Sequence, residues 1–261
     1  MASVLGMLAA TASAAMGAAT FTVGGGTAVY SQSFDGMGTS GTATPADWTA
    51  QGIGGGGDPN STAVTGTTVA PFEYTAPPTS FVGIANVGGG LDRALGGVGA
   101  TATGTLAYQL EITNNTGAPL TSFTVGYTGE QWRRGKDSGA NTSVAETLVM
   151  RYGATSTSFV EMGAAYNFTT PQVSAASDVY IDGNDVANRV TGIGGTYAPA
   201  SPIADGATFF LRWTDVNSPS SPDALLAIDD FTIVAAAVPE PASLGLLVST
   251  GLLALRRRRR A

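Results

Sequence analysis

The chain has 261 residues, of which 12% are charged, and it contains neither cysteine nor histidine. These absences exclude disulfides, thiolate nucleophiles, zinc–thiolate sites, Ser-His-Asp triads and imidazole metal ligands. A bound metal would have to be a hard cation held by oxygen atoms, and an enzyme would have to use carboxylates, Lys, Tyr or Ser. The 36 glycines, with abundant Thr, Ser and Ala, are typical of a turn-rich all-β protein.

The net charge of −7 is unevenly distributed along the chain. Five of the twelve basic residues stand together near the C-terminus: Arg256, Arg257, Arg258, Arg259 and Arg260. Without the residues from Pro239 onward, seven basic residues remain against 18 acidic ones, a net charge of −11. We therefore expect the body to be repelled by nucleic acid and by anionic membrane surfaces, and we predict no nucleic-acid partner.

The N-terminal residues 1–19 are predicted to be a signal peptide for Sec export. An apolar stretch runs from Val4 to about Ala15, and small residues offer cleavage after Ala14 or Ala18. No Lys or Arg precedes the apolar stretch, and a buried Ala-rich helix is the alternative interpretation.

Residues 20–236 are predicted to form one β-domain. In "TLAYQLEIT", Leu106, Tyr108, Leu110 and Ile112 fall on one face, with Ala107, Gln109 and Glu111 on the other. After the turn residues "NNTGAP", the stretch "LTSFTVGYT" continues with Phe123, Val125 and Tyr127 on one face, which suggests a hairpin.

Six further stretches read as strands between Gly, Pro, Asn and Ser runs: "AVYSQSF", "SFVGIANV", "ETLVMRYG", "SFVEMGAAYNF", "ATFFLRWTDV" and "LLAIDDFTIV". No window outside the termini supports an amphipathic helix. Many short strands with turn signals predict an antiparallel, jelly-roll-like β-sandwich.

The tail, residues 237–261, combines three features. Val238-Pro239-Glu240-Pro241-Ala242 is followed by 14 uncharged residues, Ala242 to Leu255, and then by the arginines. As a helix, 14 residues span about 21 Å, short of the roughly 30 Å of hydrocarbon in a bilayer. In an exported chain the arginines would stop transfer and stay cytoplasmic. A nucleic-acid-binding tail and a disordered basic tail are the alternatives.

These three features, in this order, resemble the PEP-CTERM sorting signal of exported bacterial proteins. The resemblance implies recognition of Pro-Glu-Pro by a membrane-embedded exosortase, a transient anchor in the inner membrane through a short transmembrane helix, and delivery to the cell surface or extracellular matrix. The prolines fix φ and lack amide donors, so they favour an extended, accessible motif.

The body is similar to a jelly-roll module of exported bacterial proteins. The similarity rests on "SFDGM", "TGEQWRRG", "IDGNDVANRV" and "LRWTDVNSPSSPDALLAIDDFTI", over roughly residues 33 to 233. The closing "AIDDF" resembles the last strand of many carbohydrate-binding sandwiches. The resemblance implies a non-catalytic role.

Glu130, Trp132 and Arg133 form the first candidate site. They could bind a ligand beside an aromatic platform for a sugar ring, a role also open to Trp48 and Trp213. Alternatively, Glu130 pairs with Arg133 or Arg212 in a structural network while Trp132 packs in the core, which is a common use of Arg–carboxylate groups.

Asp182, Asn184 and Asp185 offer oxygen ligands in a tight turn, with Asp215, Asn217, Asp229 and Asp230 as further donors. A structural Ca²⁺ is one interpretation, because Ca²⁺ takes six to eight oxygens from loops. Asp and Asn are equally ordinary turn residues.

Paired carboxylates could also hydrolyse glycosides, and four glutamates are available for such a pair: Glu111, Glu130, Glu146 and Glu161. No acid-rich motif supports this enzyme hypothesis, which ranks last. The sequence thus predicts an exported, non-catalytic surface or matrix protein. The alternative is a secreted carbohydrate-binding module that contacts extracellular polysaccharide.

Overall fold

The computed structural model describes residues 19–22, 27–54, 57–101, 103–216 and 223–236. The predicted signal helix, the C-terminal helix, the Pro-Glu-Pro motif and Arg256–Arg260 lie outside these ranges. Within them, no helix is long and apolar enough to cross a membrane.

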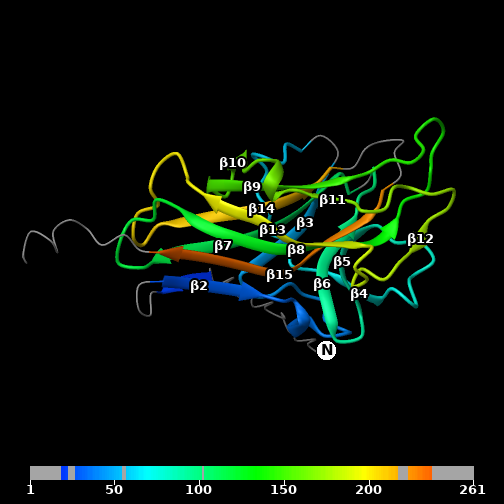
Figure 1. The fold of residues 1–261 in the computed structure, drawn as a ribbon, viewed down its shortest axis with the longest axis horizontal. Coiled ribbons are helices and arrows are strands. Elements are labelled where there is room, and N and C mark those ends of the chain that lie inside the picture. Colours follow the sequence, from blue (N-terminus) through cyan, green and yellow to red (C-terminus); the bar gives the residue numbers. More distant parts are fainter. Residues whose placement is uncertain (1–18, 23–26, 55–56, 102, 217–222, 237–261) are drawn as a thin grey trace, which may run out of the picture.

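The described residues form two β-sheets (Figure 1). Sheet A contains β1 (Ala19–Thr22), β3 (Trp48–Ile53), β7 (Thr105–Asn115), β9 (Thr147–Thr155), β10 (Ser158–Glu161), β11 (Phe168–Thr169) and β14 (Thr208–Asp215). Sheet B contains β2 (Thr27–Gln32), β4 (Ala70–Glu73), β5 (Gly83–Gly89), β6 (Asp92–Val98), β8 (Phe123–Arg134), β12 (Val179–Tyr180), β13 (Arg189–Tyr197) and β15 (Leu225–Ala236). The 3₁₀ turns η1 (Asp35–Met37) and η2 (Ala164–Tyr166) join strands. The all-β prediction is confirmed for this part of the chain.

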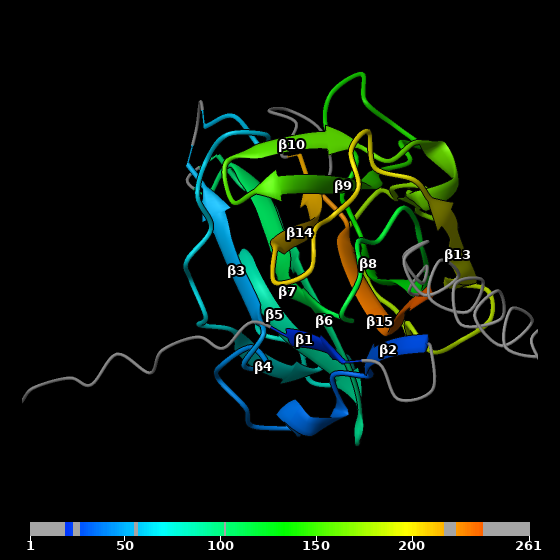
Figure 2. The same cartoon turned by 90° about the vertical axis from the view of Figure 1, so that its left-hand side faces the viewer.

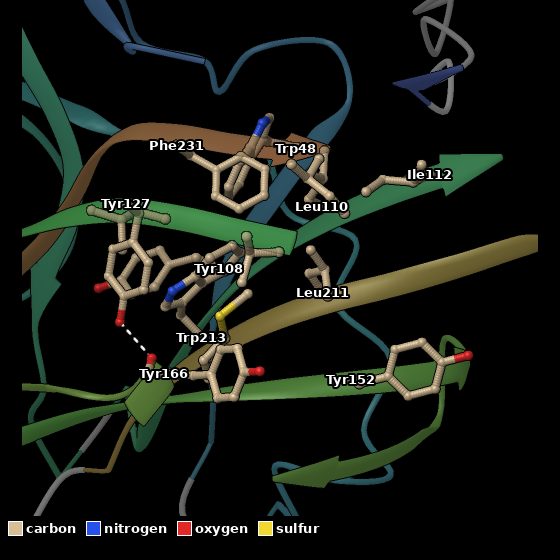
Figure 3. Close-up of a cluster of buried hydrophobic side chains, with 14 of the residues drawn as sticks. Trp48, Tyr108, Leu110, Ile112, Tyr127, Tyr152, Tyr166, Leu211, Trp213 and Phe231 are labelled. Atoms are coloured by element: carbon tan, nitrogen blue, oxygen red, sulfur yellow. Dashed lines mark hydrogen bonds between the residues drawn. The ribbon is translucent and has the colours of Figure 1, made fainter. Parts of the chain in front are cut away.

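The two sheets enclose one main core. In Figure 2, β9, β10 and β14 of sheet A lie above β2 and β15 of sheet B. Alternate residues of both sheets point inward, including Tyr108 and Leu110 of β7 and Ile228 of β15, and they form one buried cluster. Figure 3 shows the centre of this cluster, where the Tyr127 hydroxyl donates a 2.7 Å hydrogen bond to the Tyr166 carbonyl. The predicted inward face of Leu106, Tyr108, Leu110 and Ile112 is therefore confirmed, although Ala107 and Gln109 on the other face are buried as well.

The predicted hairpin between residues 105–113 and 120–128 is wrong. β7 pairs with β14, β3 and β1 in sheet A, whereas β8 pairs with β15, β13 and β12 in sheet B. The connection crosses from one layer to the other, and the Asn114 amide holds it by donating to the carbonyls of Ala118, Ile203 and Ala204. Two successive strands that each have one apolar face can bury those faces either as neighbours in one sheet or across the core in two facing sheets. Side-chain alternation alone therefore did not specify the pairing partner.

Five of the six further strand predictions overlap single strands, namely β2, β5, β9, β14 and β15. The sixth, "SFVEMGAAYNF", is correct only at its ends, β10 and β11, because the 3₁₀ turn η2 lies between them. Six of the described strands, two to nine residues long, escaped prediction: β1, β3, β4, β6, β12 and β13. Glycines interrupt β6 ("DRALGGV") and β13 ("RVTGIGGTY"), which removes the side chains that signal a strand. Most pairings are antiparallel as predicted, but β1 with β7 and β4 with β5 are parallel.

Candidate binding groove

The outward face of sheet A carries two rows of side chains that cross neighbouring strands. The first row runs through Thr49, Gln109, Arg212 and Arg151 on β3, β7, β14 and β9, which the strand register places opposite one another. In the second row, Glu111 of β7 lies opposite Phe210 of β14. Asp47 adjoins the same row, because its carbonyl accepts the Glu111 amide at 3.2 Å. Polar and charged groups therefore dominate this face.

A loop within residues 57–66 forms one wall over these rows. The Gln51 Oε1 atom accepts the amides of Thr65 and Gly66, both at 2.9 Å, and its Nε2 donates to the Ala63 carbonyl. Farther along the loop, Arg212 Nη1 donates to the Pro59 carbonyl at 2.7 Å. Side chains of the sheet thus hold the wall in place.

Between the wall and the sheet lies a groove of about 380 Å³. Pockets of a few hundred Å³ hold small ligands in many proteins. The lining residues combine carboxylates, hydroxyls, one amide and one aromatic ring: Asp47, Thr49, Ala63, Val64, Thr65, Gln109, Glu111, Ser156 and Phe210.

Gln109 presents a fixed hydrogen-bond donor to this groove. Its Oε1 accepts two bonds from Arg212, from Nε at 3.1 Å and from Nη2 at 2.5 Å. This fork determines which end of the amide is oxygen, because a guanidinium only donates. Gln109 is 4% exposed, and its Nε2 has no hydrogen-bond partner among the described residues. A ligand in the groove can accept this bond.

Asp47 and Glu111 give the groove a negative charge. Neither carboxylate forms an ion pair in the described part of the chain. Burial raises the pKa of Asp47, and the hydrogen bond of its carboxylate with Tyr30 opposes that rise. Arg212 offers no counter-charge at the surface, because it is fully buried and donates to Gln109, Pro59 and Ser156.

The Arg212 guanidinium also lies 3.7 Å from the centre of the Phe159 ring. Burial, together with the neighbouring Arg151, lowers the pKa of Arg212 to about 10. Arg212 is therefore charged at neutral pH. Its hydrogen bonds fix the orientation of the Gln109 amide and hold the loop of the wall at the Pro59 carbonyl.

The three tryptophans are buried, so the prediction that they serve as sugar-stacking platforms is wrong. Trp48, Trp132 and Trp213 are each 0% exposed. Trp48 stacks on Trp213 at 5.4 Å between the sheets (Figure 3), and its Nε1 donates to the Tyr30 hydroxyl. Trp132 belongs to a second apolar cluster with Phe72 and Leu225 on the outer face of sheet B. Fully enclosed rings cannot contact a glycan.

Glu130, Trp132 and Arg133 are held within the protein. Trp132 Nε1 donates to Glu130 Oε2 at 3.0 Å, while Arg133 Nη2 donates to the Asp223 carbonyl at 2.7 Å. The predicted ion pair of Glu130 with Arg133 or Arg212 is wrong: Arg133 pairs with Asp178, at 3.9 Å, and Arg212 belongs to the other sheet. The packing of Trp132 matches the structural interpretation.

Glu130 and Asp229 are buried carboxyl groups on one face of sheet B. Burial raises the pKa of Glu130 to about 8 and that of Asp229 to about 9, and the charge of Glu130 adds to the shift of Asp229. Glu130 Oε1 has no hydrogen-bond partner among the described residues. These groups lie away from the groove, on the opposite sheet.

The predicted calcium ligands form a hydrogen-bonded turn. Asp182 accepts the Asn184 amide at 3.0 Å and the Tyr74 hydroxyl at 3.1 Å, and Asp185 accepts the Ala187 amide at 2.9 Å. Within the ranges that the structure describes, no three acidic side chains gather in a way that could hold a metal ion. Calcium binding here stays a prediction.

The sequence signal for the groove was weak. Alternation in β7 places Gln109 and Glu111 on the face opposite the core, and this placement is correct. Nothing in the sequence indicated that Asp47, Thr49 or Phe210 would join them, because these residues come from strands that are distant in sequence.

Comparisons with known proteins assign no family. No protein-family model matches the chain, and no curated protein matches it. Among solved structures, the chain is similar to the K3 cleaved adhesin domain of Lys-gingipain from Porphyromonas gingivalis W83, with 16% identity, a TM-score of 0.34, and coverage of 78% of this chain and 97% of that one.

Two further solved structures are similar at a comparable level. The first is the arabinose-bound MgGH51 α-L-arabinofuranosidase, with 10% identity, a TM-score of 0.34, and coverage of 84% of this chain but 29% of that one. The second is the non-crystalline-cellulose-specific carbohydrate-binding module CBM28, with 13% identity, a TM-score of 0.26, and coverage of 57% and 76%. All three TM-scores lie below 0.5, so none of these proteins assigns an activity to this chain.

Proposed function

We propose that the protein is an exported surface or extracellular-matrix protein, sorted by an exosortase through a PEP-CTERM signal. One observation carries this proposal: Val238-Pro239-Glu240-Pro241-Ala242, a 14-residue uncharged stretch and five arginines follow one another in the order that such a signal requires. The composition of the body supports it. Without the residues from Pro239 onward the net charge is −11, so the cluster of five arginines is a feature of the tail alone. In this proposal the tail is a sorting signal that the exosortase recognises after Sec export, and the β-domain is the functional part of the protein outside the cell.

Replacing Pro239, Glu240 and Pro241 with alanine tests this sorting proposal. We expect the variant to be exported but retained, uncut, in the inner membrane, because the extended motif above the membrane is lost. Cell fractionation and the mass of the protein from each fraction measure the outcome. The matched control is Pro78→Ala with Pro202→Ala, two prolines outside the strands. Unchanged delivery of the triple variant would refute the sorting proposal.

A second function is favoured by the groove on sheet A: binding of extracellular saccharide. The amide, hydroxyl and carboxylate groups that line it suit the hydroxyls of a sugar, and Phe210 supplies an apolar contact.

The alternation of β7, β8 and β9, and of β13, β14 and β15, between the sheets supports a jelly-roll topology for this domain.

We propose that this binding is not accompanied by hydrolysis. Glycosidases place two carboxyl groups on either side of the scissile bond. Asp47 and Glu111, the acidic residues that line the groove, are instead neighbours joined by a backbone hydrogen bond, so the groove does not place one carboxyl group on each side of a ligand.

A further inference from the structure

We propose that the groove on sheet A selects saccharides that contain a free amino group, with the sugar ammonium held between Asp47 and Glu111 and a ring oxygen accepting a bond from Gln109. This inference rests on the saccharide-binding function proposed above and adds the chemical class of the ligand.

The two acidic residues in the lining of the groove are the first reason. Asp47 directly precedes Trp48, the register partner of Leu110, and its carbonyl accepts the Glu111 amide at 3.2 Å, so Asp47 and Glu111 are neighbours. Both line the groove, and the Asp47 carboxylate is also hydrogen-bonded to Tyr30. A groove lined by two acidic side chains attracts a cationic ligand and repels an anionic one.

The lack of a local counter-charge is the second reason. The nearest basic side chains, Arg212 and Arg151, point their donors at protein acceptors: Arg212 at Gln109, Pro59 and Ser156, and Arg151 at Asn60, Thr214 and Glu161. Neither arginine lines the groove. Uronic acids, sulfated sugars and phosphorylated sugars would therefore meet two carboxylates with no exposed basic group to bind them.

The third reason distinguishes a sugar from a bare cation. Gln109 lines the groove and is 4% exposed, and its Nε2 donates no hydrogen bond among the described residues, so it is free to donate to a ligand; a lone ammonium ion cannot accept that bond. The hydroxyls of Thr49 and Ser156 and the ring of Phe210 line the same space. A ligand that complements all of them carries an ammonium, several hydroxyl oxygens and an apolar ring face, and an amino sugar combines these features.

Calorimetry on the full-length protein tests the inference with four hexamers of matched length: glucosamine, N-acetylglucosamine, galacturonic acid and lysine. We expect the glucosamine hexamer to bind at least about tenfold more tightly than the N-acetylated one, because acetylation removes the charge-assisted bonds. We expect any binding of the galacturonic acid hexamer, which can contact Arg256–Arg260, to be unaffected by Glu111→Gln, and the affinity for the glucosamine hexamer to fall as salt is added. The glucosamine hexamer should remain intact after incubation.

Two variants locate the binding site. Glu111→Gln should weaken binding of the glucosamine hexamer about tenfold and leave the fold intact, since Glu111 forms no ion pair in the described structure. Asp185→Asn, an exposed acidic residue of a turn next to sheet B, is the matched control and should bind like the wild type.

The outcomes separate the two proposals. If none of the saccharides binds, the saccharide-binding function is wrong. If the N-acetylated hexamer binds as tightly as the glucosamine hexamer, or if Glu111→Gln weakens binding of the acidic hexamer as much as that of the glucosamine hexamer, saccharide binding stands and the amino-sugar inference is wrong. Equal binding of the lysine hexamer, or an unchanged affinity of Glu111→Gln, would also overturn the inference.

Discussion

At the scale of single residues, carboxyl groups have two different roles in this protein. Asp47 and Glu111 face an open groove, whereas Glu130 and Asp229 are enclosed on the other sheet. Enclosure disfavours the ionised form, which is why the pKa of Glu130 rises to about 8 and that of Asp229 to about 9. The groove carboxylates are those that we propose bind a ligand, and the enclosed ones make stability depend on pH.

Glu130 should make the protein less stable at alkaline pH. The folded state keeps a proton on Glu130 that the unfolded chain, with an ordinary pKa near 4.5, has already lost. The free energy of unfolding should therefore be highest below about pH 4.5 and fall as the pH rises to about 8. Each pKa unit corresponds to about 1.4 kcal/mol, so Glu130→Gln should be more stable than the wild type by roughly 2 kcal/mol or more at high pH.

Urea titrations between pH 5 and about pH 9 measure this difference. Glu161→Gln is the control, because the Glu161 side chain is 58% exposed and its ion pair with Arg151 should contribute little. A pH dependence that is the same in Glu130→Gln and in the wild type would contradict the prediction.

At the scale of elements, β15 shows how one strand serves two partners. Leu226–Ile228 pair with β6 and Phe231–Ala236 pair with β2 along the same edge, while β8 occupies the other edge. The change of partner takes place at a bulge at Asp229 and Asp230, where Asp230 has a φ of 48°. The sequence "AIDDF" marked this strand correctly, but the extra residue in the ladder is a feature of tertiary pairing.

The positive φ of Asp230 at this bulge predicts that glycine is tolerated at the position and that valine is destabilising. Asp230→Gly should lie within about 1 kcal/mol of the wild type, because glycine adopts a positive φ without strain and that gain offsets its larger entropy when unfolded. Asp230→Val should lower the free energy of unfolding by about 1–3 kcal/mol, since a β-branched residue is strained in this region. Urea denaturation of both variants decides the question, and equal stability of the two would show that the bulge does not constrain residue 230.

At the scale of the whole molecule, the tryptophans join the two sheets instead of binding a ligand. Trp48 of β3 and Trp213 of β14 stack on each other, and both contact Phe231 of β15 from the opposite sheet. Burying these large rings, at roughly 25 cal/mol per Å² of apolar area, is a major contribution to stability. The binding surface must therefore lie outside this centre, as the groove does.

Iodide quenching of tryptophan fluorescence should report this arrangement. Because all three tryptophans are 0% exposed, iodide should quench the folded protein little and the urea-unfolded protein strongly. Addition of the glucosamine hexamer should leave the folded emission unchanged, since no tryptophan lines the groove. Protection from strong quenching by a saccharide would instead place a tryptophan at the binding site.

The sequence by itself determined the all-β class and which residues of β7 face the core. It therefore also placed Gln109 and Glu111 on the opposite face, because side-chain alternation is a local property of a strand. It also carried the segment Val238–Ala242, on which the proposed sorting rests. Only the tertiary structure decided that β7 and β8 lie in different sheets, that the tryptophans are buried, and that Asp47 meets Glu111 above Gln109. Those features depend on which strands become neighbours, and that choice comes from packing between residues far apart in the chain.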